Sequence, residues 1–485
     1  MIRKLQTFVL VSGVWVASAC SSVPAEVQAV QDVAEAMGGV EAVLGATSLS
    51  IDGGGTGYVV GQAPTPDVGS LGGDGTYESQ FDLANHQMRT EASNDAFGFP
   101  LITVSSLDGD IAFNAGGFNP APPARIGGPA ASRRWAEYFH HPVTLLQAAL
   151  ADEAAMAIAI GPVRQEGGYD VIPIATTDGV ELSLHVDPAS GLPMAITSMV
   201  YDTNLGNAEL STAFADWADA GGLQLPGTIT QTLAGSPVGE WTVTHAVNVD
   251  VGDLSAPADV AAAPEPGAPV PNVVVEALAD GVWFLGGESH NSVVVELEDF
   301  AVLVEAPLND ARTLAAIEQA RALVPDKPLQ YVVNTHHHFD HSGGVRAAVA
   351  EGLTVVTHEI NEAFYQDMTA RSHSLSPDRL ETTPTELSLE LVPGDEVLEL
   401  GDGDRVLQVF RIAGDPHNAG MLVAYLPAEG ILIEGDIYTP GGFATDLPNL
   451  AANIERRGLA VTTIAPIHGA VAPFSQFLEE AAAAQ

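Results

Sequence analysis

The chain has 485 residues, enough for two or three domains, and its 46% hydrophobic content is ordinary for a globular protein. Its 62 acidic residues outnumber 17 basic ones, so the formal net charge is −45. A charge of that sign and size repels nucleic acids and anionic membrane surfaces, and we therefore exclude nucleic acid as a partner.

The first 20 residues have the pattern of an export signal. Residues 1–4 include two basic side chains, residues 8–17 are a short apolar run, and small residues precede Cys20. A cysteine at this position resembles the lipobox of bacterial lipoproteins, although simple cleavage after Ala19 is the alternative. We predict a signal peptide at 1–20, lipidation of Cys20, a tether at 21–29, and a periplasmic protein attached to the outer membrane. Because Cys20 is the only cysteine, intrachain disulfides and thiolate metal ligands are excluded.

Residues 30–254 predict a mainly antiparallel β domain, because short alternating strands are separated by Gly/Asp turns. A helix interrupted at Gly38–Gly39 is expected over 27–44, and another helix over 132–150. The second helix carries His140 and His141, whose side chains point in different directions, so we expect them to be structural or at the surface. His245 lies in the apolar stripe of a strand and is expected to pack in the core. No catalytic constellation is evident in this domain.

Residues 255–272 are rich in proline and alanine and predict a linker without helix or strand. Residues 273–485 predict a second domain in which strands and helices alternate. The strands are expected at 281–285, 292–297, 300–304, 330–334 and 353–357, and the helices at 310–324 and 359–368. This alternation indicates an α/β fold.

A histidine-rich stretch follows the expected strand at 330–334. Four histidines and an aspartate lie within positions 336–341, and Gly343–Gly344 then opens a helix. The stretch is therefore expected on a strand-to-helix loop, where a rigid scaffold presents it. Imidazole and carboxylate groups are ligands that zinc, iron and manganese prefer. His417, Asp436 and His468 come later, each just after an expected strand.

The pattern H-x-H-x-D-H at positions 336–341 resembles the signature of the metallo-β-lactamase-fold hydrolases. The resemblance covers about residues 272–485 and implies an αββα sandwich, with three more ligands downstream in the order found here. It implies a first ion held by His336, His338 and His417, and a second ion held by Asp340, His341 and His468. Asp436 is implied to bridge two ions, expected to be Zn²⁺, with iron or manganese possible.

The resemblance also implies the chemistry. Two cations lower the pKa of a shared water, so that hydroxide is the nucleophile towards a small-molecule substrate. Asp340 is expected to be catalytic as well as a ligand, because it holds that hydroxide in position. Tyr438, two residues after Asp436, is the candidate hydrogen-bond donor to an oxyanion.

Five further polar residues are candidates near the mouth of the site. His337 is not a ligand position of the motif and is expected to stabilise the loop or line the entrance. The other four are Asn418, His290, His358 and His373.

An aspartate at 436 and the scarcity of lysine favour an ester, thioester or lactone substrate over a β-lactam, as in glyoxalase-II-like and lactonase-like members. Two alternatives stay open: a mono-iron enzyme similar to persulfide dioxygenases, and a non-catalytic metal-binding relay lipoprotein.

Overall fold

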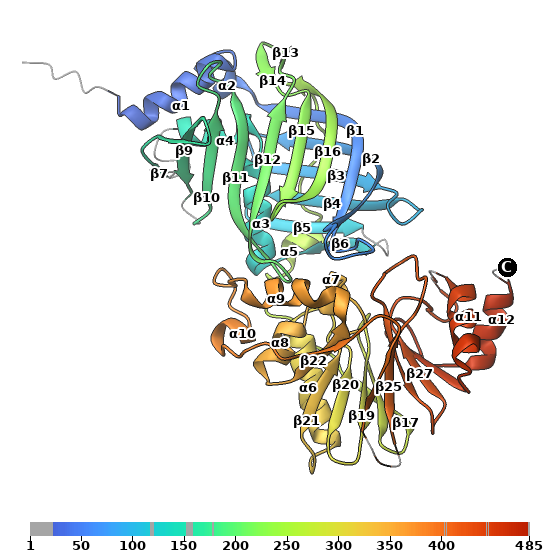
Figure 1. Cartoon of the computed structure of the whole chain (residues 1–485). Coiled ribbons are helices and arrows are strands. Elements are labelled where there is room, and N and C mark those ends of the chain that lie inside the picture. The colour runs from blue at the N-terminus through green and yellow to red at the C-terminus, as the bar shows by residue number, and fades with distance from the viewer. Residues whose placement is uncertain are drawn as a thin grey trace, which may run out of the picture.

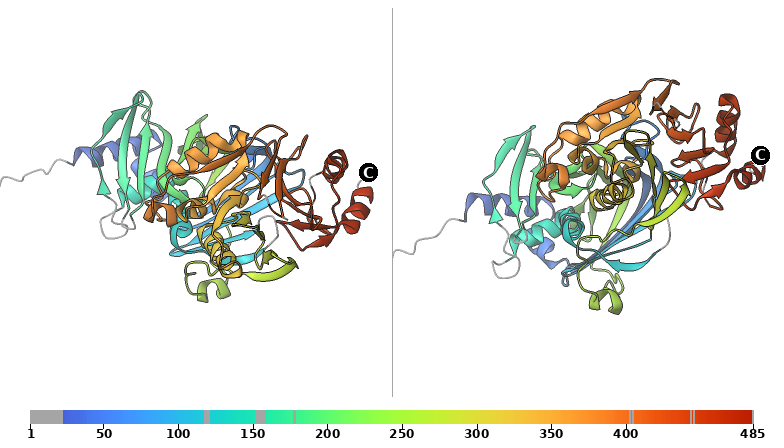
Figure 2. Two further views of the ribbon diagram at one scale, coloured as in Figure 1. Left: turned by 60° about the horizontal axis from the view of Figure 1, so that its bottom comes forward. Right: turned by 90° about the horizontal axis from the view of Figure 1, so that it is seen from below.

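The computed structural model describes residues 23–116, 121–151, 159–176, 179–401, 403, 405–442, 444 and 446–483. The predicted signal peptide and Cys20 lie outside these residues. Two domains are stacked end to end (Figure 1), and the views in Figure 2 keep α1 and the C-terminus at opposite ends of the molecule. Among the described helices, none is long and apolar enough to cross a membrane.

The N-terminal domain is built on one curved sheet of 14 strands, which are all paired antiparallel. Its order is β6-β5-β4-β3-β2-β1-β16-β15-β12-β11-β10-β9-β7, with β8 beside β9, and β13 and β14 form a separate hairpin. The strands are β1 Ser48–Val60, β2 Ser70–Asp82, β3 Gln87–Asn94, β4 Leu101–Asp108, β5 Ile111–Gly116, β6 Ala121–Arg125, β7 Ala159–Ile160, β8 Arg164–Glu166, β9 Tyr169–Ala175, β10 Glu181–Val186, β11 Pro193–Asp202, β12 Gly206–Ala215, β13 Ala218–Ala220, β14 Leu223–Leu225, β15 Thr228–Leu233 and β16 Ser236–Val247.

Helices pack against one face of this sheet and form the main core of the domain with it. They are α1 Ala25–Ala36, α2 Val40–Gly45, α3 Gly128–Phe139 and α4 Pro142–Leu150. Two of the expected boundaries are wrong. The single helix expected at 132–150 is two helices, because Pro142 cannot continue α3 and instead occupies the first turn of α4, capped by His141. The tether expected at 21–29 already contains the start of α1.

The expected linker is not free of helix, since α5 Ala258–Ala262 lies within it. Arg125 of β6 donates a hydrogen bond from Nη1 to the Ala263 carbonyl at 2.7 Å. The segment is therefore tied to the N-terminal domain before β17 begins at Val274.

The C-terminal domain is the αββα sandwich that was predicted, and the fold-class prediction is confirmed. Its first sheet contains β17 Val274–Ala279, β18 Val282–Gly286, β19 Ser292–Glu296, β20 Ala301–Val304, β21 Leu329–Val333, β22 Thr354–His358 and β23 Leu389–Val392. Its second sheet contains β24 Val397–Leu400, β25 Leu407–Arg411, β26 Leu422–Leu426, β27 Ile431–Glu434, β28 Thr463–Pro466 and β29 Ala472–Pro473.

Aliphatic side chains of the two sheets face each other and are fully buried, which makes the central core of the sandwich. A second apolar cluster joins the first sheet to the helices outside it, and a third joins the second sheet to its own two helices. The outer helices of the first sheet are α6 Asp310–Leu323, α8 Val345–Ala350, η1 Glu359–Asn361, α9 Glu362–Ala370 and α10 Arg379–Thr382, and those of the second are α11 Leu447–Arg457 and α12 Phe474–Ala483. The short helix α7 Phe339–Ser342 lies at the junction with the N-terminal domain (Figure 1).

The two domains meet through turns of the N-terminal sheet. Asn204, in the β11–β12 turn, donates hydrogen bonds from Nδ2 to the Phe339 carbonyl at 3.1 Å and to Ser342 Oγ at 2.9 Å. The β1–β2 turn approaches the same short helix, since Phe339 N donates to the Gly61 carbonyl at 3.3 Å. The N-terminal sheet is thus fastened to the loop that carries the histidine-rich stretch.

Candidate metal centre

The predicted metal-binding side chains all follow the C-terminal ends of strands, where the backbone leaves the sheet and side chains converge. Positions 336–341 follow β21, His417 follows β25, Asp436 follows β27 and His468 follows β28. A glycine permits the closest approach, because a Cβ on Gly435 would lie 2.9 Å from Thr335 Oγ1 and 3.4 Å from His336 Nδ1.

The first group of converging side chains contains His336, His338, His417 and Asp436. One ligand atom from each lies within 4.8 Å of all the others. Asp436 Oδ2 is 3.0 Å from His417 Nε2 and 3.5 Å from His336 Nε2. Three imidazoles around one open position are the arrangement of a catalytic zinc site.

The second group contains Asp340, His341, His468 and also His290, again with ligand atoms within 4.8 Å of one another. Asp436 reaches this group with its other oxygen: Oδ1 is 2.7 Å from His341 Nε2 and 2.8 Å from His468 Nε2. One carboxylate therefore faces both groups, one oxygen to each. This is the geometry that a bridging ligand between two cations requires.

Two buried nitrogen atoms show that the first group fits a metal ion. His336 Nε2 and His338 Nδ1 are buried and have no hydrogen-bond partner. Their other ring nitrogens are engaged, His336 Nδ1 with Thr335 Oγ1 at 3.0 Å and His338 Nε2 with the Ala63 carbonyl at 3.0 Å. An unpaired buried nitrogen is costly unless something binds it, and a cation between these atoms and Asp436 would do so.

The charge states also suit metal binding. Burial, together with neighbouring imidazoles, holds the pKa of His336 and that of His338 well below the ordinary value, so both rings are neutral ligands. Burial alone would raise the pKa of Asp436, but His341 and the hydrogen-bonding histidines hold it well below its usual range. The first group thus combines two neutral imidazoles with an ionised carboxylate, whereas the neighbouring carboxylates Asp436 and Asp340 raise the pKa of His341 in the second group.

Glu305, directly after β20, is a functional candidate that the sequence patterns did not reveal. Its side chain is fully buried, and Oε2 lies 3.1 Å from His341 Nδ1 while accepting a hydrogen bond from Thr335 Oγ1 at 2.6 Å. Metal-ligating histidines commonly donate their second N–H to such a carboxylate, which fixes the ring. A charged residue that ends the apolar run of β20, at the edge where β21 also ends, is the signal that points to it.

Glu434, the last residue of β27, is a second buried carboxylate that the patterns missed. It accepts hydrogen bonds from Ile437 N at 3.0 Å and from Tyr438 N at 3.2 Å. Burial raises its pKa well above the ordinary value. It holds the tight turn that presents Asp436.

Tyr438 is not brought to the centre, and its prediction as an oxyanion donor is corrected. The side chain is fully buried in the apolar cluster under α11 and α12, where its ring lies 5.2 Å from that of Phe477. Burial, together with the carboxylates of Glu480 and Glu434, raises the pKa of Tyr438 to about 12. The turn held by Glu434 directs Asp436 and Tyr438 to opposite sides.

The five polar candidates near the mouth lie in different environments. His290 joins the second group: Nε2 is 3.1 Å from Asp340 Oδ2, and its ring is 4.0 Å from that of His468. His337 is buried, and Asn418 binds its Nδ1 at 3.0 Å, so this pair stabilises the loop. His358 caps η1 and reaches the Gly394 carbonyl, and His373 lies 3.2 Å from Asp378, so neither faces the centre.

The histidines of the N-terminal domain are surrounded by other side chains of that domain. Both ring nitrogens of His140 meet hydroxyl groups at 2.9 Å, those of Thr212 and Ser198, and His141 Nε2 is 3.4 Å from His245 Nε2. His140 and His141 are buried, so a surface position is wrong.

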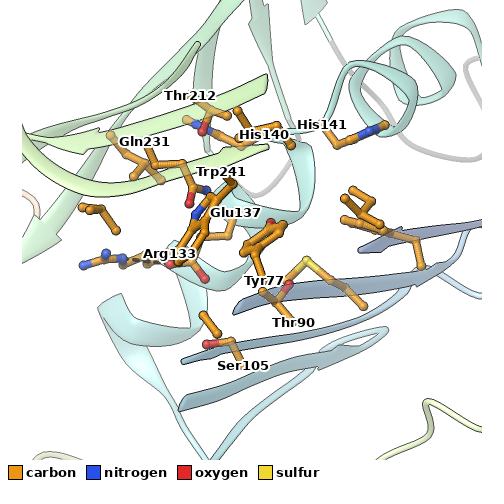
Figure 3. Close-up of a pocket in the computed structure, with 17 residues that line it drawn as sticks. Tyr77, Thr90, Ser105, Arg133, Glu137, His140, His141, Thr212, Gln231 and Trp241 are labelled. Carbon is orange, nitrogen blue, oxygen red and sulfur yellow. Dashed lines mark hydrogen bonds and ion pairs between the residues drawn. The ribbon is translucent and has the colours of Figure 1, made fainter. Parts of the chain in front are cut away.

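His140 and His141 line a cavity of about 150 Å³ under α3, where Figure 3 shows Arg133, Glu137, Tyr77 and Trp241 around the same space. Its lining contains none of the metal-centre residues.

Two facing sheets between layers of helices, with groups of histidine and aspartate at one edge, define an α/β-sandwich domain with a candidate metal site. Residues 285–475 match the family model described as the metallo-beta-lactamase superfamily. The C-terminal domain belongs to this superfamily, which confirms the resemblance found in its motifs.

Solved structures similar to the chain carry the same family name. They include a metallo-beta-lactamase from Pontibacter korlensis (19% identity, 44% of this chain, 98% of that chain, TM-score 0.34) and one from Hirschia baltica (21%, 44%, 97%, 0.34). A third is the metallo-beta-lactamase FIM-1 from Pseudomonas aeruginosa in its mono-zinc form (24%, 44%, 96%, 0.34). A search of curated proteins found no match.

Proposed function

We propose that the chain is an exported metal-dependent hydrolase with two ions, expected to be Zn²⁺, that cleaves an ester, thioester or lactone bond in a small molecule. The observation that carries the proposal is Asp436, which turns Oδ2 to His417 and Oδ1 to His341 and His468. A cation on each side of this carboxylate would balance its buried charge and use both of its oxygens.

The residues divide between two ions. The first would be held by His336, His338 and His417, the second by Asp340, His341 and His468, with His290 beside them and Asp436 between the two ions. When bound, the ions lower the pKa of a shared water and supply the nucleophile, which explains why no serine or cysteine nucleophile is needed.

The open side of the centre follows from side-chain exposure. The side chain of Asp340 is 34% exposed and that of His468 is 25% exposed, whereas those of His336 and His341 are fully buried. Substrate would therefore approach past Asp340 and His468. Burial alone would raise the pKa of Asp340, but His341 and His290 hold it far below the ordinary value, so its carboxylate is ionised and can accept a hydrogen bond from the attacking water.

The charges around the centre support an uncharged scissile group. In the described part of the chain, the ion pairs of Asp340 are with His290 and His341, and neither partner is a lysine or an arginine. A substrate carboxylate that approached past Asp340 would find no cationic partner of that kind there. This supports thioesters, lactones and simple esters over substrates that need a basic anchor.

The experiment is a metal analysis of the purified chain combined with a substrate panel of thioesters, lactones, phosphodiesters and β-lactams. We expect two zinc ions per chain, turnover of an ester, thioester or lactone, and loss of turnover in His336→Ala. Turnover that survives His336→Ala would overturn the hydrolase mechanism. One iron per chain, with oxygen-dependent turnover of a persulfide, would instead support the mono-iron alternative.

We further propose that Cys20 is lipidated and anchors the chain to the outer membrane from the periplasmic side. The support is the sequence pattern alone: a positive start, a short apolar run, and small residues before the single cysteine. Expression of the full precursor should give a membrane-associated, lipid-labelled protein, and Cys20→Ser should give neither. An unlabelled, freely secreted parent protein would refute the anchor.

A further inference from the structure

The turn between β1 and β2 belongs to the N-terminal domain but touches the metal centre directly. We propose that Gln62 and Ala63 of this turn are positioning residues of the centre, so that the N-terminal domain completes the metal site of the other domain. The inference rests on the metal centre of the proposed function but not on any hydrolysis.

Gln62 holds one oxygen of Asp340. Its Nε2 donates a hydrogen bond to Asp340 Oδ1 at 2.8 Å, across 278 positions of sequence. The other oxygen, Oδ2, is thereby turned towards His290 Nε2, at 3.1 Å, and the second group. Asp340 is the most exposed carboxylate of the centre, so without the amide its Oδ1 would lose this partner and the side chain would be held less firmly, through Oδ2 and His290.

Ala63 determines which nitrogen of His338 is available to a metal. The Ala63 carbonyl lies 3.0 Å from His338 Nε2, and a carbonyl oxygen can only accept, so Nε2 must carry the proton. In a neutral ring Nδ1 is then a lone-pair donor. His338 Nδ1 is the buried atom without a hydrogen-bond partner in the first group. The backbone of the N-terminal domain thus fixes the tautomer that metal binding needs.

The turn is docked through its backbone and is not a loose neighbour. Phe339 N donates to the Gly61 carbonyl at 3.3 Å, and Ala419 N donates to the Pro64 carbonyl at 2.9 Å. Ala63 is fully buried between these contacts. Four consecutive residues, 61–64, therefore each contact a loop that carries metal-centre residues.

Gly61 shows how close this contact is. Its φ is +72°, and a Cβ at this position would lie 2.2 Å from the ring of Phe339 in the C-terminal domain. Gly69, at the other end of the turn, has a similar φ of +78°, but its Cβ would meet only Ser236 Oγ of the N-terminal domain, at 2.9 Å. The two glycines have the same backbone constraint, and only Gly61 borders the metal-bearing loop.

The test measures zinc affinity of the full chain by competition with a chromophoric chelator. Removing an outer partner of a metal ligand typically costs about 10–100-fold in affinity, so Gln62→Ala should weaken binding of one zinc ion by about that factor. Val68→Ala is the matched control, because that side chain is 57% exposed on the same turn and should leave affinity unchanged.

A second readout separates positioning from general stability. With EDTA present, Gln62→Ala should unfold at the same temperature as the parent. Only when zinc is added should its unfolding temperature be lower than that of the parent. Gly61→Ala should also weaken zinc binding, whereas Gly69→Ala should bind zinc as the parent does, although both carry a strained backbone.

Parental zinc affinity in both Gln62→Ala and Gly61→Ala would overturn the inference, as would an equal loss in Gly69→Ala. A protein that binds two zinc ions with the expected Gln62 effect, but hydrolyses nothing in the panel, would leave this inference standing and refute the proposed function.

Discussion

The two domains both bury histidines, and the difference between them shows how a metal centre is recognised. In the N-terminal domain both nitrogens of His140 are matched by the hydroxyls of Thr212 and Ser198. In the C-terminal domain His336 and His338 each have one ring nitrogen with a hydrogen-bond partner and one buried ring nitrogen without a hydrogen-bond partner. Burial of a histidine therefore does not by itself identify a metal site. An unmatched nitrogen that converges with others on a carboxylate marks the site.

The largest expected effect comes from removing a ligand with an unmatched nitrogen. His336→Ala should lose the first metal ion and reduce turnover on the order of a thousandfold, because such an ion supplies several kcal/mol of transition-state stabilisation. His140→Gln, at an equally buried histidine of the other domain, should keep full metal content. Metal analysis and kinetics on both variants check the contrast, which fails if His140→Gln also loses metal.

A smaller effect is expected at Glu305, whose carboxylate lies within hydrogen-bond distance of Nδ1 of His341. Glu305→Gln removes the charge but retains the shape, and metal affinity should fall by about 10–100-fold. Isothermal titration with zinc measures the loss. Unchanged affinity would mean that Thr335 and Asn334, which also bind this carboxylate, are its real partners.

His140, whose two ring nitrogens both meet hydroxyl groups, should make the stability of the protein depend on pH. Burial lowers the pKa of His140 to about 3, against an unfolded value of about 6.5. The unfolded chain therefore binds the proton first, and the stability due to neutral His140 is present above pH 6.5 and lost as the pH falls from there towards 3. Between pH 7.5 and 5.5 this loss is about 1.4 kcal/mol.

Urea unfolding at the two pH values, for the parent and for His140→Gln, isolates that contribution. The variant should be less sensitive to acid by about the same amount. An identical pH dependence in both proteins would show that His140 is not held neutral.

The smallest effect is expected at Tyr438. Tyr438→Phe should change turnover by less than about twofold, because the side chain packs against Phe477 and not at the centre. Steady-state kinetics on the best substrate would test this. A fall in kcat of tenfold or more, with KM unchanged, would restore its role as an oxyanion donor.

The fold of the C-terminal domain and the convergence of seven side chains on one centre could be predicted from the sequence. Each of these side chains follows a strand, and the apolar pattern of that strand can be recognised in the sequence. The sequence placed His290 near the mouth but not among the second group, and it did not identify Glu305 or Gln62, because these roles depend on which strands and turns become neighbours in space. It also misplaced Tyr438, because the direction of a side chain two residues beyond Asp436 depends on the turn held by Glu434. In the N-terminal half, Pro142 ends one helix and begins the next, a break that the proline itself indicates.

The central claim is that the two groups around Asp436 hold one ion each. Zinc content of the purified full chain, compared with His417→Ala and His468→Ala, tests it most directly. We expect two zinc ions in the parent and one in each variant, since each substitution removes a ligand from a different group. A parent without bound metal, or variants that both retain two ions, would contradict it.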